Sequence, residues 1–176
     1  MKGGEPMTMT ERELWTVLHG MVFGAIFLLA FAGGFAGLWS LKPELITSAG
    51  IGERMKRLVI GMWTMAIMAW LTVISGTYIV YPWYRAGDPG SPRSLLLANA
   101  DTKAWHTFGM EWKEHVGWFA PVLATAAAFI VTYYGPRLAE KNQLRKAALV
   151  LLTIAFLAAA VAGSFGAFLN KVAPIR

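Results

Sequence analysis

Apolar residues are concentrated in four long runs, which are separated by segments rich in polar and charged residues. The runs cover residues 14–41, 58–80, 116–134 and 147–169. Each has about the 20 residues that a helix needs to cross the hydrocarbon core of a bilayer. Because the backbone must satisfy its own hydrogen bonds in lipid, we expect the runs to be helices. The pattern predicts an all-α integral membrane protein, a four-transmembrane-helix bundle that forms a single membrane domain over residues 1–176.

The segment between the second and third runs predicts a further short helix at the membrane surface. Residues 87–92 contain glycines and prolines that cannot stay helical. After them, Trp105, Phe108, Trp112 and His115 recur at helical spacing on one face, with charged residues elsewhere. We therefore expect residues 95–115 to form an amphipathic interfacial helix that leads into the third span.

The two halves of the chain carry the same order of features. His19 lies near the start of the first apolar run and His115 just before the third. Each is followed by an apolar run, a short basic loop and another apolar run. A duplication into two tandem helix-pair half-repeats would place a pseudo-twofold axis along the membrane normal. The likeness rests on position and not on residue identity, so a true repeat and a chance resemblance both stay open.

The composition excludes several classes of protein. The chain has no cysteine, which excludes disulfides, thiolate-bound iron–sulfur clusters and covalently attached haem. Its formal net charge of +6 comes from Lys and Arg that flank the apolar runs, so nucleic acid is not an expected partner. No charged residue falls inside the four runs, which argues against an ion-coupled transporter. The first run is too long for the apolar part of a cleaved signal peptide.

The distribution of basic residues predicts the orientation. Loops 42–57 and 135–146 hold eight Lys and Arg, and the other side holds eight more over about twice as many residues. Because the positive-inside rule concerns short loops, the denser pair is expected in the cytoplasm. We expect the chain to lie in the inner (cytoplasmic) membrane of a prokaryote, with its histidine side facing the periplasm.

Histidine is scarce and gathered on one side of the predicted bundle. His19 and His115 occupy matching positions, and we expect them to be the two axial ligands of one haem b. We also expect Arg85 and Lys171 to bind the haem propionates. Gly33 and Gly163 are expected to leave room for the haem ring between the helices. The plainer alternatives are an interfacial role for the histidines and simple helix packing for the glycines.

His106 marks a second candidate site. It lies nine residues before His115, about half a turn away on a continuous helix, so the two cannot ligate the same iron. With Glu111 and Glu114 it is a candidate for accepting protons from a quinol. The alternatives are a second metal site at His106 and ordinary solvated surface positions for all three.

These features predict a membrane-embedded b-type cytochrome subunit, and not a stand-alone enzyme. It would transfer electrons at one membrane surface between the quinone pool and another redox protein. The expected cofactors are one bis-His haem b and a quinone. The expected partners are the lipid bilayer, other subunits of a larger complex and a c-type cytochrome or similar protein. Two alternatives stay open: a cofactor-free accessory subunit of a respiratory or photosynthetic complex, and a (bacterio)chlorophyll-binding subunit.

Overall fold

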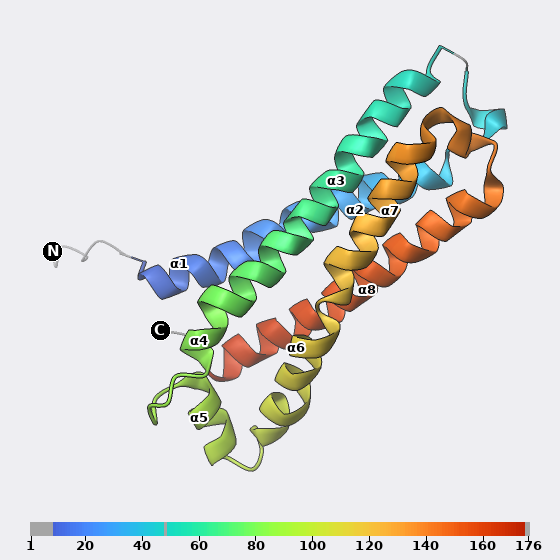
Figure 1. Cartoon of the computed structure of the whole chain (residues 1–176). Coiled ribbons are helices and arrows are strands. Elements are labelled where there is room, and N and C mark those ends of the chain that lie inside the picture. The colour runs from blue at the N-terminus through green and yellow to red at the C-terminus, as the bar shows by residue number, and fades with distance from the viewer. Residues whose placement is uncertain (1–8, 48, 175–176) are drawn as a thin grey trace, which may run out of the picture.

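Four long helical rods make up the molecule, and the computed structural model describes them over residues 9–47 and 49–174 (Figure 1). The first rod joins α1 (Glu11–Val17), the π-helical turn η1 (Leu18–Val22) and α2 (Phe23–Trp39). The second joins α3 (Ile51–Ser75), the π-helical turn η3 (Gly76–Val80) and α4 (Tyr81–Tyr84). The third joins the π-helical turn η4 (Trp105–Met110), α6 (Glu111–Val116) and α7 (Phe119–Tyr134), and the fourth is α8 (Asn142–Val172). Shorter elements connect the rods: η2 (Pro43–Leu45), α5 (Pro92–Ala98) and η5 (Gly135–Ala139).

All four rods are long and apolar enough to cross a membrane. They contain 29, 34, 35 and 31 residues, counting η5 with the third. The predicted bundle of four transmembrane helices is thereby confirmed, and the chain is an integral membrane protein whose outer faces contact lipid. Exposed leucine, isoleucine, valine and phenylalanine side chains cover those faces, as contact with acyl chains requires.

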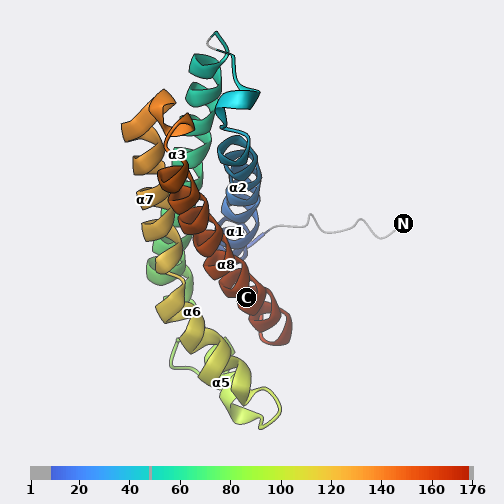
Figure 2. The same ribbon diagram turned by 90° about the vertical axis from the view of Figure 1, so that its right-hand side faces the viewer.

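The rods form a closed ring of neighbours. α2 packs against α3 and α8, and α7 packs against the same two helices, so α2 and α7 are diagonal partners (Figures 1 and 2). The start of α1, the α4–α5 connection and the end of α8 lie at one end of the bundle, here named the histidine end (Figure 1). The connections after α2 and after α7 lie at the opposite end, here named the loop end.

Small side chains let the helices approach closely. The buried face of α7 is built from alanines, including Ala124, Ala127 and Ala128, which have no exposed surface. On α2, a Cβ added to Gly34 would lie 3.0 Å from Met62 Sδ, and one added to Gly37 would lie 3.0 Å from a Leu58 methyl. Glycine at these two positions therefore allows α3 to pack directly on the α2 backbone.

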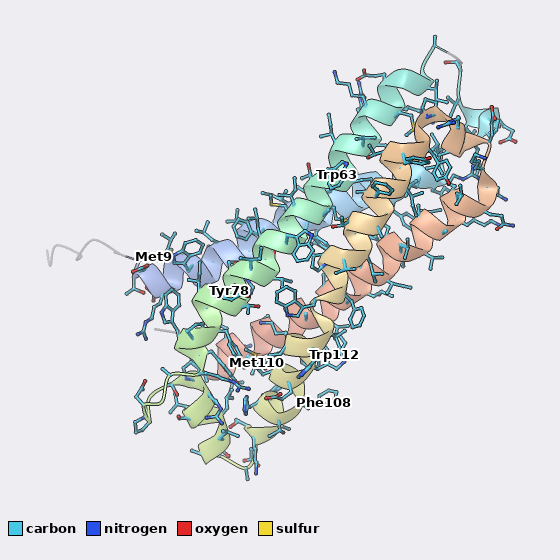
Figure 3. All side chains as sticks on the ribbon, in the orientation of Figure 1. Met9, Trp63, Tyr78, Phe108, Met110 and Trp112 are labelled. Atoms are coloured by element: carbon cyan, nitrogen blue, oxygen red, sulfur yellow. The ribbon has the colours of Figure 1, made fainter. Side chains whose placement is uncertain are left out.

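Two tryptophan–threonine hydrogen bonds join α3 to α7. Trp63 Nε1 donates to Thr132 Oγ1 at 2.9 Å, and Trp70 Nε1 donates to Thr125 Oγ1 at 3.0 Å (Figure 3 labels Trp63). The two donors are seven residues, or about two turns, apart on α3, and the two acceptors are seven residues apart on α7. Both bonds therefore join the same face of α3 to the same face of α7, and the two helices run antiparallel. Such bonds fix the register of neighbouring membrane helices.

We expect Thr125→Val to destabilise the bundle by about 0.5–1.5 kcal/mol, because the Trp70 indole N–H loses its acceptor in a site that water does not reach. Thermal unfolding in detergent measures the effect. Thr153→Val is the matched control, since Thr153 Oγ1 donates only to the Leu149 carbonyl of its own helix, at 2.8 Å. Equal stability of the two variants would mean that the interhelical bond contributes nothing.

The region between the second and third rods differs from the expected helix over residues 95–115. The short helix there is α5 (Pro92–Ala98), and the chain then turns before η4 begins at Trp105. Residues 105–116 instead extend the third rod. Their aromatic side chains pack on the C-terminal half of α8: Trp105 stacks on Phe168, and Phe108 and Trp112 contact Phe165. The aromatic stripe was correctly placed on one helical face, but that face contacts a neighbouring helix.

The arrangement predicts which connections share a side of the membrane. Because the chain lacks cysteine, single cysteines introduced at Ala49 and Gln143 report the loop end, and one at Ala100 reports the histidine end. We expect a membrane-impermeant thiol reagent to label Ala49→Cys and Gln143→Cys from the same side, and Ala100→Cys from the other. Labelling of the first two from opposite sides would contradict four spans.

Candidate functional site

Three π-helical turns gather at the histidine end, and the polar residues of the candidate site lie in or beside them. η1 contains His19, η3 directly follows Ser75, and η4 contains His106. A π turn holds one more residue than an α turn, has weaker packing along its axis and occurs often at functional sites. The local backbone and the side-chain chemistry therefore point to the same end of the bundle.

His19 faces the second rod and lies against glycine. Its Nδ1 is 3.2 Å from Ser75 Oγ, and that hydroxyl donates its own hydrogen to the Leu71 carbonyl at 2.6 Å. Nδ1–H is therefore the donor, which leaves the lone pair on Nε2. A Cβ added to Gly76 would lie 2.5 Å from His19 Cε1, so the ring occupies the space that glycine leaves free. An imidazole held at Nδ1 with a free Nε2 is the form that ligates metal or haem iron.

Lys113 also points into the bundle from the third rod. A Cβ added to Gly166 of α8 would lie 3.0 Å from Lys113 Nζ, and the ammonium is close enough to His19 for its charge to act on that ring. Among the described residues it forms no ion pair. A charged side chain directed inward in a membrane span is a candidate for a functional role.

His115 does not meet His19. It lies two residues after Lys113, about 200° further round the helix, and it is exposed on the outer face. Its Nδ1 lies 2.7 Å from the Glu111 carbonyl, which can only accept, so its Nε2 is also free. The expected pairing of His19 and His115 on one iron is not formed in this structure, although each ring separately has the tautomer of a ligand.

The other residues expected to hold a haem are also dispersed. Gly33 and Gly163 are exposed, with nothing within 4 Å of an added Cβ, so they line no internal slot. Lys171 is exposed near the end of α8. Arg85, which follows α4, forms ion pairs with carboxylates of the third rod. For Gly33, helical phase contributes to the difference, because the π turn η1 shifts every later residue of the first rod round the axis.

The second candidate site is assembled as a connected network. His106 is 5% exposed, and its Nδ1 lies 2.8 Å from the Tyr84 hydroxyl. Its Nε2 lies 4.0 Å from Glu111 Oε1, too far for a direct hydrogen bond and the right separation for a shared third group. The structure therefore brings together His106 and Glu111, as expected, and adds Tyr84, whose role the sequence did not reveal.

Arg85 connects the rest of the network. Its Nη2 lies 2.9 Å from Glu111 Oε1 and 3.4 Å from Glu114 Oε1, and its guanidinium stacks over the Tyr81 ring at 5.0 Å. Side-chain exposure rises from 7% at His106 to 22% at Glu114 and 40% at Glu111. We call Tyr81, Tyr84, Arg85, His106, Glu111 and Glu114 the polar network; it reaches from a buried imidazole to the protein surface.

Arg93 of α5 adds a donor without an acceptor. Its Nε is buried and has no hydrogen-bond partner within the part of the chain that the structure describes, and its charge acts on His106. Buried N–H groups nearly always have a partner, so this one is expected to be satisfied by a bound molecule or water. The nearby open pocket of about 410 Å³ is lined by Trp83 and Pro92, the chain neighbours of Tyr84 and Arg93, and by none of the network residues.

The third rod is longer than the hydrocarbon core is thick. Its 35 residues extend about 50 Å, whereas the hydrocarbon core is about 30 Å thick. His106 lies in the first turn of this rod, at the histidine end. Lys113 lies seven residues, about two turns, further along the rod towards the loop end.

No protein-family model, curated protein or solved structure matches this chain. Within the described residues, no group of three or more His, Asp and Glu forms a site for a metal ion. The function is therefore inferred from the geometry of the histidine end. Sequence reasoning missed Tyr84, Ser75 and Lys113, since each acquires its position from a contact with a residue distant in the chain.

Proposed function

We propose that the protein is the membrane subunit of an electron-transfer complex and exchanges electrons and protons with quinol at the polar network. The observation that carries the proposal is the buried His106, bonded to Tyr84 and separated from Glu111 by 4.0 Å. A quinol hydroxyl placed between His106 Nε2 and Glu111 could bond to both, and both can accept a proton. Arg93, whose Nε is buried without a partner among the described residues, is the candidate donor for the second oxygen of the ring.

The proposed reaction is a two-electron oxidation of quinol, in which each proton and each electron has an acceptor. Oxidation of one quinol releases two protons and two electrons. His106 and Glu111 take the protons, and the exposed carboxylates of Glu111 and Glu114 pass them to water. The electrons leave one at a time to a one-electron carrier of the haem class, either in this chain or in a partner redox protein. Arg85 holds the two carboxylates in place between turnovers.

Of the residues expected to hold haem b, His19 is the one that faces the neighbouring rod, with its Nδ1–H held by Ser75. A haem bound in this chain would be held through His19 Nε2 and would supply a one-electron carrier. His115 is exposed on the outer face and would not contribute to that site. We further propose that the histidine end faces the periplasm of a prokaryotic inner membrane, as the denser basic loops favour.

Quinone titration and visible spectroscopy of the detergent-purified protein test the proposal. We expect saturable quenching of tryptophan fluorescence by short-chain ubiquinone or menaquinone, with the quenching weakened in Tyr84→Phe. We also expect the reduced spectrum of a b-type haem, lost in His19→Ala and retained in His115→Ala. Quenching that never saturates, and is equal in Tyr84→Phe, would overturn the quinol site. A spectrum without haem would assign the electron carrier to a partner.

One observation favours a second candidate, a (bacterio)chlorophyll-binding subunit. A single histidine ligates each magnesium in such proteins, and His115 presents a free Nε2 on the outer face of the bundle. A pigment bound there would be retained after mild detergent extraction and lost in His115→Ala, while His19→Ala would keep it. That pattern is the reverse of the one expected for haem at His19.

A further inference from the structure

A second pocket lies at the loop end, where the end of α2, the turn η5 and the start of α8 meet (Figure 1). Its volume is about 490 Å³, and its lining includes Arg145 and Lys146 of α8 and Lys42 just after α2. Trp39 and Leu149 form its apolar wall on the membrane side. The pocket thus combines cationic side chains with an apolar wall at the end of two membrane spans.

Arg145 is built into this corner of the fold. It is 8% exposed, and its Nη1 donates to the Leu41 carbonyl at 2.7 Å and to the Ala139 carbonyl at 2.9 Å. Its Nη2 donates to Asn142 Oδ1 at 3.0 Å. Three of its five N–H groups are thereby used, and two remain for another acceptor. No carboxylate among the described residues pairs with it, so the charge of a largely buried guanidinium is not neutralised within the protein.

Two lysines extend the positive charge towards the membrane surface. Lys42 Nζ lies 5.4 Å from the Trp39 ring centre, and Lys146 is exposed at the rim; neither forms an ion pair among the described residues. Glu44 and Glu140 also line the pocket. They do not cancel the positive charge of this end, where loops 42–57 and 135–146 hold eight basic and three acidic residues.

We propose that this pocket binds the phosphate headgroup of an anionic phospholipid. The phosphate would bond to Arg145 and attract Lys42 and Lys146, while an acyl chain lies along Trp39, which is 60% exposed, and Leu149. Basic pockets between membrane helices on the cytoplasmic side are suited to such headgroups, and each lysine near the surface adds to the attraction. A bound lipid would also tie the end of α2 to the start of α8.

Native mass spectrometry of the detergent-purified protein, titrated with phosphatidylglycerol or phosphatidylcholine, tests the proposal. We expect wild type to retain phosphatidylglycerol preferentially. The double variant Lys42→Gln/Lys146→Gln should bind it about tenfold more weakly. The matched control is Lys56→Gln/Arg57→Gln, which removes two exposed charges from the same end outside the pocket. The control should retain wild-type affinity.

The design separates a lipid from a free anion and from general surface charge. Equal affinity of the two double variants for phosphatidylglycerol, or no preference over phosphatidylcholine in wild type, would overturn the proposal. Displacement of the lipid by millimolar inorganic phosphate would assign the pocket to a free phosphate and would also overturn it. The substituted lysines belong to no packed contact of the core, and unchanged thermal unfolding of both variants without added lipid checks their folding.

Discussion

Replacing His106 with phenylalanine is expected to slow quinol oxidation by about 10²-fold or more, because the variant cannot accept a proton at the buried end of the polar network. The ring volume is nearly kept, while the bond to the Tyr84 hydroxyl and the Nε2 that faces Glu111 are both lost. The rate is measured by stopped-flow with a short-chain quinol and a one-electron acceptor such as a c-type cytochrome.

Two further variants separate chemistry from folding at this position. His106→Gln keeps a group that can bond to Tyr84 but does not titrate near neutral pH, and we expect it to lose as much activity as the phenylalanine variant. Thr107→Ala is the control, because Thr107 is exposed and donates only to the Lys103 carbonyl in its own helix. Wild-type rates in a folded His106→Gln protein would contradict a proton-accepting role for this histidine.

The number and approximate positions of the membrane helices could be predicted because hydropathy is a local property. The length of the third rod could not be predicted, because the charges of Glu111, Lys113 and Glu114 are typical of a helix at the membrane surface. In the structure, the two carboxylates pair with Arg85 from the second rod, and the lysine turns inward against Gly166. Pairing with Arg85 lowers the cost that a hydropathy pattern assigns to each of the two carboxylates, whereas Lys113 keeps that cost.

The candidate site could be predicted in part for a related reason. His106, Glu111 and Glu114 are close in sequence, so a helical pattern brings them together. To predict whether His19 and His115 face each other, one must know how two different helices are rotated about their own axes. Each π turn adds about one residue to its helix and rotates all later residues of that helix by about 100°. Such turns in η1 and η4 leave no signal in the hydropathy pattern, so facing residues could not be assigned from spacing alone.

The structure shows a correspondence between the two halves of the chain that differs from the one predicted by sequence. His19 of the first rod lies on Gly76 of the second, and Lys113 of the third rod lies on Gly166 of the fourth. The position that corresponds to His19 by contact is therefore Lys113, and not His115. In each half a nitrogen-bearing side chain rests on a glycine of the next rod. The residue of the second half that matches His19 by contact therefore lies two positions before His115.

Lys113→Met is expected to raise the free energy of unfolding by about 1–3 kcal/mol while impairing electron transfer. An ammonium in a membrane span, with no ion pair among the described residues, is costly, and methionine fills a similar volume at no electrostatic cost. Thermal unfolding in detergent or lipid nanodiscs measures the first effect. The quinol oxidation assay measures the second, since the charge beside His19 is lost.

Lys103→Met provides the matched comparison, because Lys103 is exposed before the same rod and its removal should change stability by less than about 0.5 kcal/mol. A stabilised Lys113→Met protein with reduced electron transfer would mean that the charge is retained for function at the expense of stability, as expected for an inward-facing ion in a membrane span. A destabilised Lys113→Met protein would contradict the unpaired ammonium on which the prediction rests. Unchanged electron transfer would remove Lys113 from the site.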